Sequence, residues 1–158
     1  MDSTNQILEY KRKAARQYEA AEHLLNYTYP LVKDPKLLMG ILHNLTQAYE
    51  HAIDAVLAYE RELLLVPTYP NNSQVKLELF REKTVRRNKI PPSYLTLLLD
   101  MYEIIELQKA SPVEFQRGNR YVLCSQNYLL KTISIKEISQ YLAQTKQFLA
   151  IIDRIIRI

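Results

Sequence analysis

The chain has 158 residues, a net charge of +4 and a composition near the average of globular proteins, with 47% hydrophobic and 24% charged residues. This length suits one domain with a buried core, and this composition excludes wholesale disorder and fibrous repeats. Only two glycines occur, Gly40 and Gly118. Neither a Walker-type phosphate loop nor a dinucleotide-binding glycine motif can be written with them.

Cysteine content and hydropathy indicate the compartment. The single cysteine, Cys124, cannot form an internal disulfide, and the charged residues 1–21 lack the apolar core of a secretion signal. No run approaches the roughly 20 apolar residues that span a bilayer. We therefore expect a cytoplasmic protein.

The N-terminal part of the chain predicts a helical hairpin. Apolar residues at heptad-like spacing predict a first helix that starts near Ser3 and ends at Pro30. Asp34 followed by Pro35 is a helix-start pattern, and the apolar stripe over residues 38–59 continues for about seven turns. Because the link between the two helices is short, they must pack side by side and antiparallel.

Two prolines separate the next two predicted helices. A loop rich in proline and asparagine, residues 66–73, precedes a helix over about residues 74–87. Pro91 and Pro92 cannot both lie inside a helix, so the next helix is predicted over about residues 93–109. Its predicted buried side consists of Leu95, Leu98, Leu99, Tyr102 and Ile105.

The region near residues 113–132 contains β-prone residues and turn signals, which predict a small hairpin or an irregular excursion. Ser134 and Glu137 then form a capping-box pattern that begins the last helix. These elements predict a single mainly α-helical domain over residues 1–158. Its expected architecture is an antiparallel bundle of four to five helices.

Few residues offer metal or nucleophilic chemistry. His43, Gln47 and His51 share one helical face and Asp54 lies just beyond them. A mixed metal site is geometrically conceivable there, but polar residues beside the helix seam are the simpler interpretation. Cys124 lies in an apolar sequence that is more typical of a buried side chain than of a nucleophile. We therefore predict neither a metal nor a cofactor.

Positive charge is concentrated in the C-terminal part of the chain. Residues 1–62 hold seven basic and nine acidic side chains, whereas residues 63–158 hold fourteen and eight. Basic residues near tyrosines can neutralise phosphates and stack on the bases of single-stranded nucleic acid. The candidate nucleic-acid-binding residues are Arg81, Lys83, Arg86, Arg87, Lys89, Arg117, Arg120, Tyr121, Tyr128 and Lys131.

The segment Arg87-Asn88-Lys89-Ile90-Pro91-Pro92-Ser93-Tyr94 resembles the Arg-Asn-x-x-x-His-x-Tyr signature of HEPN domains. The resemblance implies a small helical bundle, often dimeric. Many members of that family are RNases of toxin and defence systems, and others are noncatalytic partners of nucleotidyltransferases.

The match to the HEPN signature is incomplete. Arg87, Asn88 and Tyr94 agree with it and are the candidate catalytic residues, whereas Pro92 stands where the family has its histidine. That histidine is expected to act with the arginine in RNA cleavage. The resemblance to HEPN domains therefore implies a noncatalytic member.

Segments 111–115 and 121–128 are also similar to those of small archaeal helical proteins of uncharacterised function, a resemblance that implies no activity. We expect a noncatalytic helical binding module that acts through contacts with a second copy or with a partner protein. The alternative is an RNA-binding protein, or a metal-independent ribonuclease, that uses segment 81–89. A membrane-surface role for the last helix is less favoured, because its apolar residues can complete the bundle.

Overall fold

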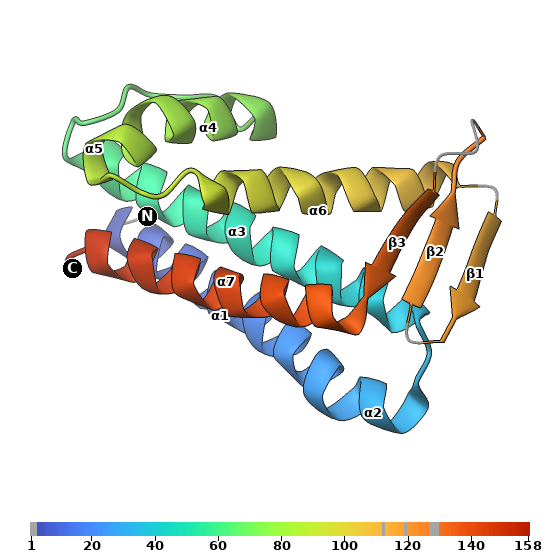
Figure 1. The fold of residues 1–158 in the computed structure, drawn as a ribbon. Helices are drawn as coiled ribbons and strands as arrows, with labels where there is room; N and C mark the ends of the chain where they lie inside the picture. Colours follow the sequence, from blue (N-terminus) through green and yellow to red (C-terminus); the bar gives the residue numbers. More distant parts are fainter. Residues whose placement is uncertain (1–2, 112, 119, 127–129) are drawn as a thin grey trace.

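The computed structural model describes residues 3–111, 113–118, 120–126 and 130–158. In these ranges the helices form an elongated bundle, and a three-stranded sheet lies at one end of it (Figure 1). The predicted fold class, mainly α-helical with a small β excursion, is confirmed. None of the described helices combines the length and the apolar character needed to cross a membrane.

The first helical rod is longer than the sequence predicts. It consists of α1 (Ser3–His23), the π-helical segment η1 (Leu24–Thr28) and α2 (Tyr29–Val32), so the prediction that Pro30 ends it is wrong. Proline has no N–H to donate, and its ring crowds the carbonyl four residues earlier in an α-helix. The π-helical turn before Pro30 is wider, so the carbonyls of that turn are offset from their α-helical positions. The rod ends instead at Lys33, whose left-handed φ of 55° is typical of a helix C-terminus.

The central helix is α3 (Lys36–Glu62), which packs antiparallel along α1 as predicted and also contacts the later helices (Figure 1). Its start is stabilised by Asp34, whose Oδ1 accepts a hydrogen bond of 3.0 Å from the backbone N–H of Lys36. Because α3 has neighbours on several sides, more than half of its residues are buried. It is the element on which the other helices assemble.

The predicted third helix forms as α4 (Ser73–Leu79), the π-helical segment η2 (Phe80–Val85) and α5 (Arg86–Asn88). Asn72 caps it through hydrogen bonds of 3.0 Å that its Oδ1 accepts from two backbone N–H groups. It ends at Lys89, which has a φ of 53°. The prolines that follow keep the chain out of helix, as predicted.

Helix α6 (Ser93–Ala110) matches its predicted bounds, but its buried side is rotated from the predicted one. Leu99 is 43% exposed, so its predicted burial is wrong, and Tyr102 is half-buried. The apolar residues of α6 nearly encircle the helix, so periodicity alone left its orientation ambiguous. Its buried residues are Leu95, Leu97, Leu98, Met101, Ile104 and Ile105.

The β excursion is an antiparallel sheet of β1 (Val113–Arg117), β2 (Arg120–Cys124) and β3 (Leu130–Ser134), with β2 in the centre. Tyr121 pairs with Ile133 across β2 and β3, and both side chains are buried. These residues point to the same face, which packs on the helices and joins their core.

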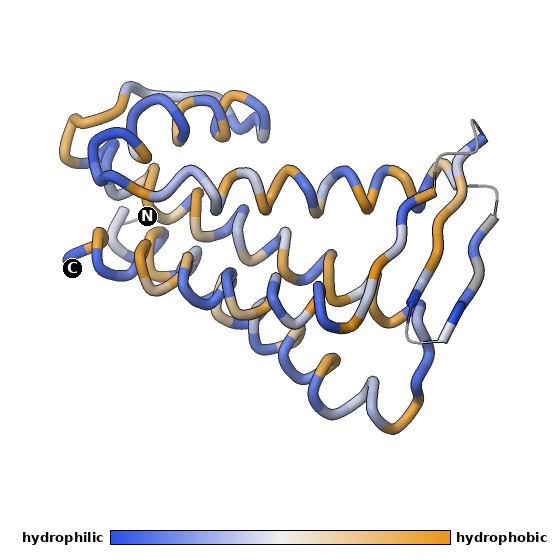
Figure 2. Tube along the Cα trace, viewed as in Figure 1, coloured by the Kyte–Doolittle hydropathy of each residue, from blue (hydrophilic) through white to orange (hydrophobic). Residues whose placement is uncertain are grey.

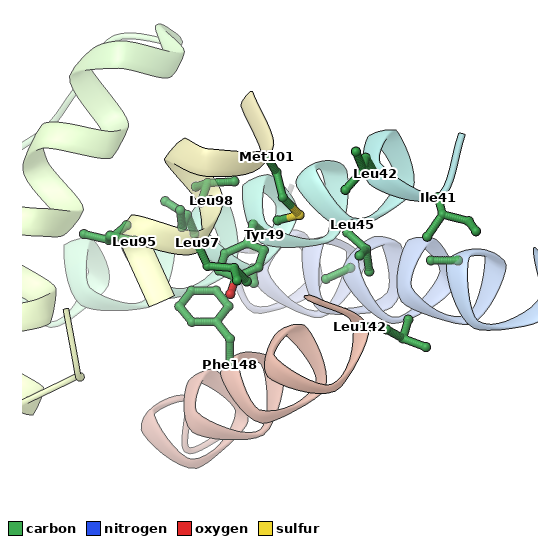
Figure 3. Packing of buried hydrophobic residues seen from close by; sticks show 14 of the residues in the cluster. Ile41, Leu42, Leu45, Tyr49, Leu95, Leu97, Leu98, Met101, Leu142 and Phe148 are labelled. Carbon is green, nitrogen blue, oxygen red and sulfur yellow. The ribbon is translucent and has the colours of Figure 1, made fainter. Parts of the chain in front are cut away.

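The last helix, α7 (Ile135–Ile155), runs back along the bundle from the sheet (Figure 1). Its predicted capping box is confirmed, because Ser134 Oγ accepts a 3.2 Å hydrogen bond from the Glu137 N–H. Hydrophobic residues recur in successive turns of α6 and α7 (Figure 2). In the core, Phe148 of α7 stacks on Tyr49 of α3 with ring centroids 4.3 Å apart (Figure 3).

Candidate binding site at the α5 end of the bundle

A buried carboxylate organises the end of the bundle where α5 lies. Glu60 occupies the last turn of α3 on its buried side, and only 2% of its side chain is exposed. Its Oε1 accepts a hydrogen bond of 2.5 Å from Thr84 Oγ1, and its Oε2 accepts one of 2.6 Å from Arg87 Nη1. A buried charge needs such partners, since removing it from water without them is very costly.

The two leading residues of the HEPN-like segment are directed toward this carboxylate. Arg87 also donates through Nη2 to the Leu65 carbonyl at 2.7 Å. Asn88 Nδ2 donates to Glu60 Oε2 at 3.3 Å and to the Thr84 carbonyl at 2.9 Å. These bonds connect α5 to the end of α3 and to the loop that follows it. Both side chains therefore have a structural role in fixing α5.

Tyr94, the third candidate catalytic residue, has different partners. It lies in the first turn of α6, where its hydroxyl donates a 3.2 Å hydrogen bond to Gln147 Oε1 of α7. Its ring centroid lies 5.8 Å from that of Phe148. Arg87 and Asn88 are thus bound to α3, whereas Tyr94 is bound to α7.

An open pocket of about 560 Å³ lies between α3, α5 and α7 next to the Glu60 cluster. Its walls include Tyr59, Ile151 and Ile155. We call it the cationic pocket, because among the described residues four basic side chains line it and the one acidic residue, Glu60, is already bonded to Arg87. Those four are Arg87, Lys89, Arg154 and Arg157.

Three consecutive leucines lie at this end of the bundle, and the first and third of them, Leu63 and Leu65, line the same pocket. Leu63, Leu64 and Leu65, which we call the leucine segment, are 52%, 89% and 41% exposed. Leu64 has a left-handed φ of 59°, a conformation that costs roughly 1–2 kcal/mol for a residue with a side chain. This φ belongs to the C-terminal closure of α3, where the Leu65 N–H donates to the Glu60 carbonyl at 2.8 Å. The exposure of three adjacent large apolar side chains is what indicates an interaction surface.

The remaining basic candidates fall into two groups at opposite ends of the bundle. Arg81, Lys83 and Arg86 are exposed near α5, whereas Arg117, Arg120 and Lys131 are exposed on the sheet (Figure 1). The 18 residues of α6 lie between the two groups, a span of about 27 Å. The structure therefore does not bring the predicted basic residues together on one continuous face.

Tyr121 does not offer the exposed ring that stacking on a nucleic-acid base requires. Tyr121 is only 3% exposed, and its hydroxyl donates to a carboxylate oxygen of Glu114. Burial, followed by that hydrogen bond, raises the pKa of Tyr121. Its ring faces the core and offers no surface to a base. Tyr128 lies outside the described residues.

The polar residues that share one face of α3 differ in their exposure. His43 and Gln47 are exposed, whereas His51 is half-buried. In the described ranges, no group of three or more His, Cys, Asp or Glu side chains is arranged to hold a metal ion. Cys124 is a half-buried free thiol of β2.

Sequence reasoning missed Glu60, the residue on which this site depends. Its signal was a charged side chain on the apolar stripe of a long helix, four residues after Val56. Such a residue requires a buried partner, but nothing local in the sequence indicates that Thr84 and Arg87 supply it.

Comparison with known proteins gives this chain no relative: no family model, curated protein or solved structure matches it. The resemblance to HEPN domains stays a prediction. Functional inference therefore depends on the two ends of the bundle and on its pockets.

Proposed function

We propose that this chain is a noncatalytic helical binding module that binds an acidic, partly apolar segment of a partner protein at its α5 end. The observation that carries this proposal is the exposed leucine segment beside the cationic pocket. Apolar contacts and opposite charges are together what a stable protein interface uses. We place this activity in the cytoplasm.

The charge of this end favours a different protein over a second copy as the partner. A two-fold contact would bring Lys89, Arg154 and Arg157 of each chain together, and like charges across an interface cost several kcal/mol. An acidic segment would instead neutralise them. A dimer formed through another surface remains compatible with this use of the α5 end.

The noncatalytic character is supported by the use of Arg87 and Asn88. Both donate to Glu60, and Pro92 stands at the position of the HEPN histidine. An arginine that stabilises a phosphoryl transition state has to direct its donors to the substrate. Here two donors of Arg87 are directed to protein oxygens.

A direct test uses a fluorescently labelled peptide in which glutamates alternate with leucines, and a second peptide with lysine in place of each glutamate. Fluorescence anisotropy measures binding to the wild type, to the double variant Arg154→Glu/Arg157→Glu and to Leu64→Asn. Asparagine tolerates the left-handed backbone of residue 64, so this change removes apolar surface without unfolding the loop. Leu99→Asn, at an exposed leucine of α6 away from the pocket, is the matched control.

We expect the acidic peptide to bind at least tenfold more tightly than the basic one. The double reversal should weaken binding at least tenfold, and Leu64→Asn should weaken it more than Leu99→Asn. Equal binding by both peptides, or an affinity that the double reversal leaves unchanged, would contradict the proposal.

RNA is the second candidate ligand, favoured by one observation. In the part of the chain that the structure describes, Arg81, Lys83 and Arg86 form no ion pair and are exposed on the same helical segment. Labelled single-stranded RNA should then bind with an affinity that falls steeply with salt. Arg86→Glu should weaken it, and Arg117→Glu at the far end should do so less. RNA binding that is insensitive to salt or to Arg86→Glu excludes this candidate.

A further inference from the structure

A second pocket, of about 500 Å³, lies between α3, α4 and α6, and we call it the α4 pocket. Ile53, Leu77 and Leu98 supply its apolar lining. Its polar lining includes Glu50 and His51 from successive positions of α3. Its size and its combination of apolar walls with a few polar groups are typical of small-molecule sites. None of its lining residues lines the cationic pocket.

Lys76, the one basic side chain that lines this pocket in the part of the chain that the structure describes, is already neutralised. Lys76 Nζ lies 2.9 Å from Asp54 Oδ1 and donates a 2.7 Å hydrogen bond to Asn71 Oδ1. The side chains of Lys76 and Asp54 are 16% and 18% exposed, so this ion pair is mostly shielded from water. Its charges cancel and leave little attraction for an anion.

The charge that remains is that of Glu50. Its Oε1 accepts a 2.5 Å hydrogen bond from the Tyr102 hydroxyl. Burial, followed by that hydrogen bond, raises the pKa of Tyr102, so the phenol stays protonated and donates. Among the described residues no basic side chain forms an ion pair with Glu50. The α4 pocket therefore carries one uncompensated negative charge in a protein of net charge +4.

His51 adds an unused polar atom. Its Nδ1 is buried and has no hydrogen-bond partner in the described ranges. The pKa of His51 is lowered, mainly by burial and also by the charge of Lys13. The charges of Asp54 and Glu50 oppose this shift but do not cancel it. A pKa lowered from 6.5 favours the neutral imidazole at pH 7, so His51 adds no positive charge to the pocket. A buried polar atom left without a partner is unfavourable.

We propose that the α4 pocket binds a small organic ammonium ion, with its charged nitrogen at Glu50 and His51 and its apolar body against Leu77 and Leu98. An ammonium group has three donors and a positive charge, which suit the carboxylate of Glu50. The apolar body displaces water from the lining side chains. A carboxylate ligand would be repelled by the charge of Glu50, and a neutral alcohol could not form an ion pair with it.

Three six-carbon probes of similar length and different head-group charge test this assignment: hexylammonium, hexan-1-ol and hexanoate. Each is titrated into isotopically labelled full-length protein at pH 7.5, and NMR follows the amides of Leu77 and Leu98 and the imidazole of His51. Glu50→Gln removes the charge but keeps an amide oxygen to accept from Tyr102. Glu103→Gln, an exposed position of α6 outside the pocket lining, is the matched control. Circular dichroism melting verifies that both variants are folded.

We expect hexylammonium to bind at least tenfold more tightly than hexan-1-ol, as measured from these signals, because a hydrogen bond to a charged group is stronger than one between neutral groups. Glu50→Gln should weaken hexylammonium at least tenfold, and Glu103→Gln should leave it unchanged. Equal binding of hexylammonium and hexan-1-ol overturns the proposal in favour of apolar capture alone. Preferential binding of hexanoate, or no shifts with hexylammonium, overturns it as well.

Discussion

The ion pair of Glu60 and Arg87 offers the sharpest test of how this fold is held together. Replacing Arg87 by methionine keeps most of the side-chain volume but leaves the Glu60 carboxylate buried without its cation. Breaking a buried pair in this way costs about 3–5 kcal/mol. Arg87 is 31% exposed and Glu60 keeps its bonds from Thr84 and Asn88, so the lower value of about 3 kcal/mol applies.

A second replacement should recover part of that loss. In the double variant Glu60→Leu/Arg87→Met no charge stays buried, and apolar replacements of buried pairs are often neutral or stabilising. The hydroxyl of Thr84 then loses its acceptor, which costs about 1–3 kcal/mol at a buried position. We therefore expect the double variant to be more stable than Arg87→Met alone.

Urea unfolding followed by circular dichroism measures these differences. With slopes of about 1–3 kcal/mol/M, a loss of about 3 kcal/mol in Arg87→Met should lower the midpoint by roughly 1–3 M at an unchanged slope. The control is Arg86→Met at the neighbouring residue, which is exposed and should change the free energy of unfolding by less than about 0.5 kcal/mol. If Arg87→Met matched this control, or if the double variant were the less stable, the structural role assigned to Arg87 would be refuted.

Three further predictions concern local structure and pH. Ser134→Ala removes the acceptor for the Glu137 N–H and should lower the free energy of unfolding by about 1 kcal/mol in urea unfolding; no change would refute the cap. Lys33→Gly removes the strain of a left-handed backbone and should raise the free energy of unfolding by about 0.5–1 kcal/mol. The control Lys13→Gly, inside α1, should lower the free energy of unfolding by about 1 kcal/mol, and equal effects of the two changes would argue against strain at Lys33. The folded-state pKa of His51 lies below 6.5, so the unfolded chain binds the extra proton and stability should fall as pH drops through 6.5 toward that lowered pKa. His51→Gln should flatten this pH dependence between pH 7.5 and 5, and an unchanged slope would contradict it.

Helix positions were largely predictable because their signals are local. The Asp34-Pro35 start, the Pro91-Pro92 break and the Ser134 cap each depend on residues within one turn, and each is found in the structure. The errors came where the signal depends on neighbours. Pro30 is accommodated by a π turn, and Leu99 is exposed because the orientation of α6 is set by the elements that cover it.

The candidate sites were less predictable, because chemistry depends on contacts between distant segments. The basic residues of 81–89 were visible in the sequence, but Arg87 meets Glu60 from 27 positions earlier. His51 was considered with His43 and Gln47 as one helical face, whereas its neighbours in the α4 pocket come from α4 and α6. Spacing along one helix cannot indicate which residues another helix presents to it.

The sequence by itself determined the class of this protein: a mainly α-helical domain with a small β excursion and without a glycine-rich nucleotide loop. Those properties follow from periodicity, caps and composition, which act over a few residues. Only the tertiary structure decided that Arg87 is bound to Glu60, that Tyr121 is buried, and that the basic groups lie at opposite ends. The physical reason is that burial and charge pairing are set by helix packing, which brings together residues far apart in the chain.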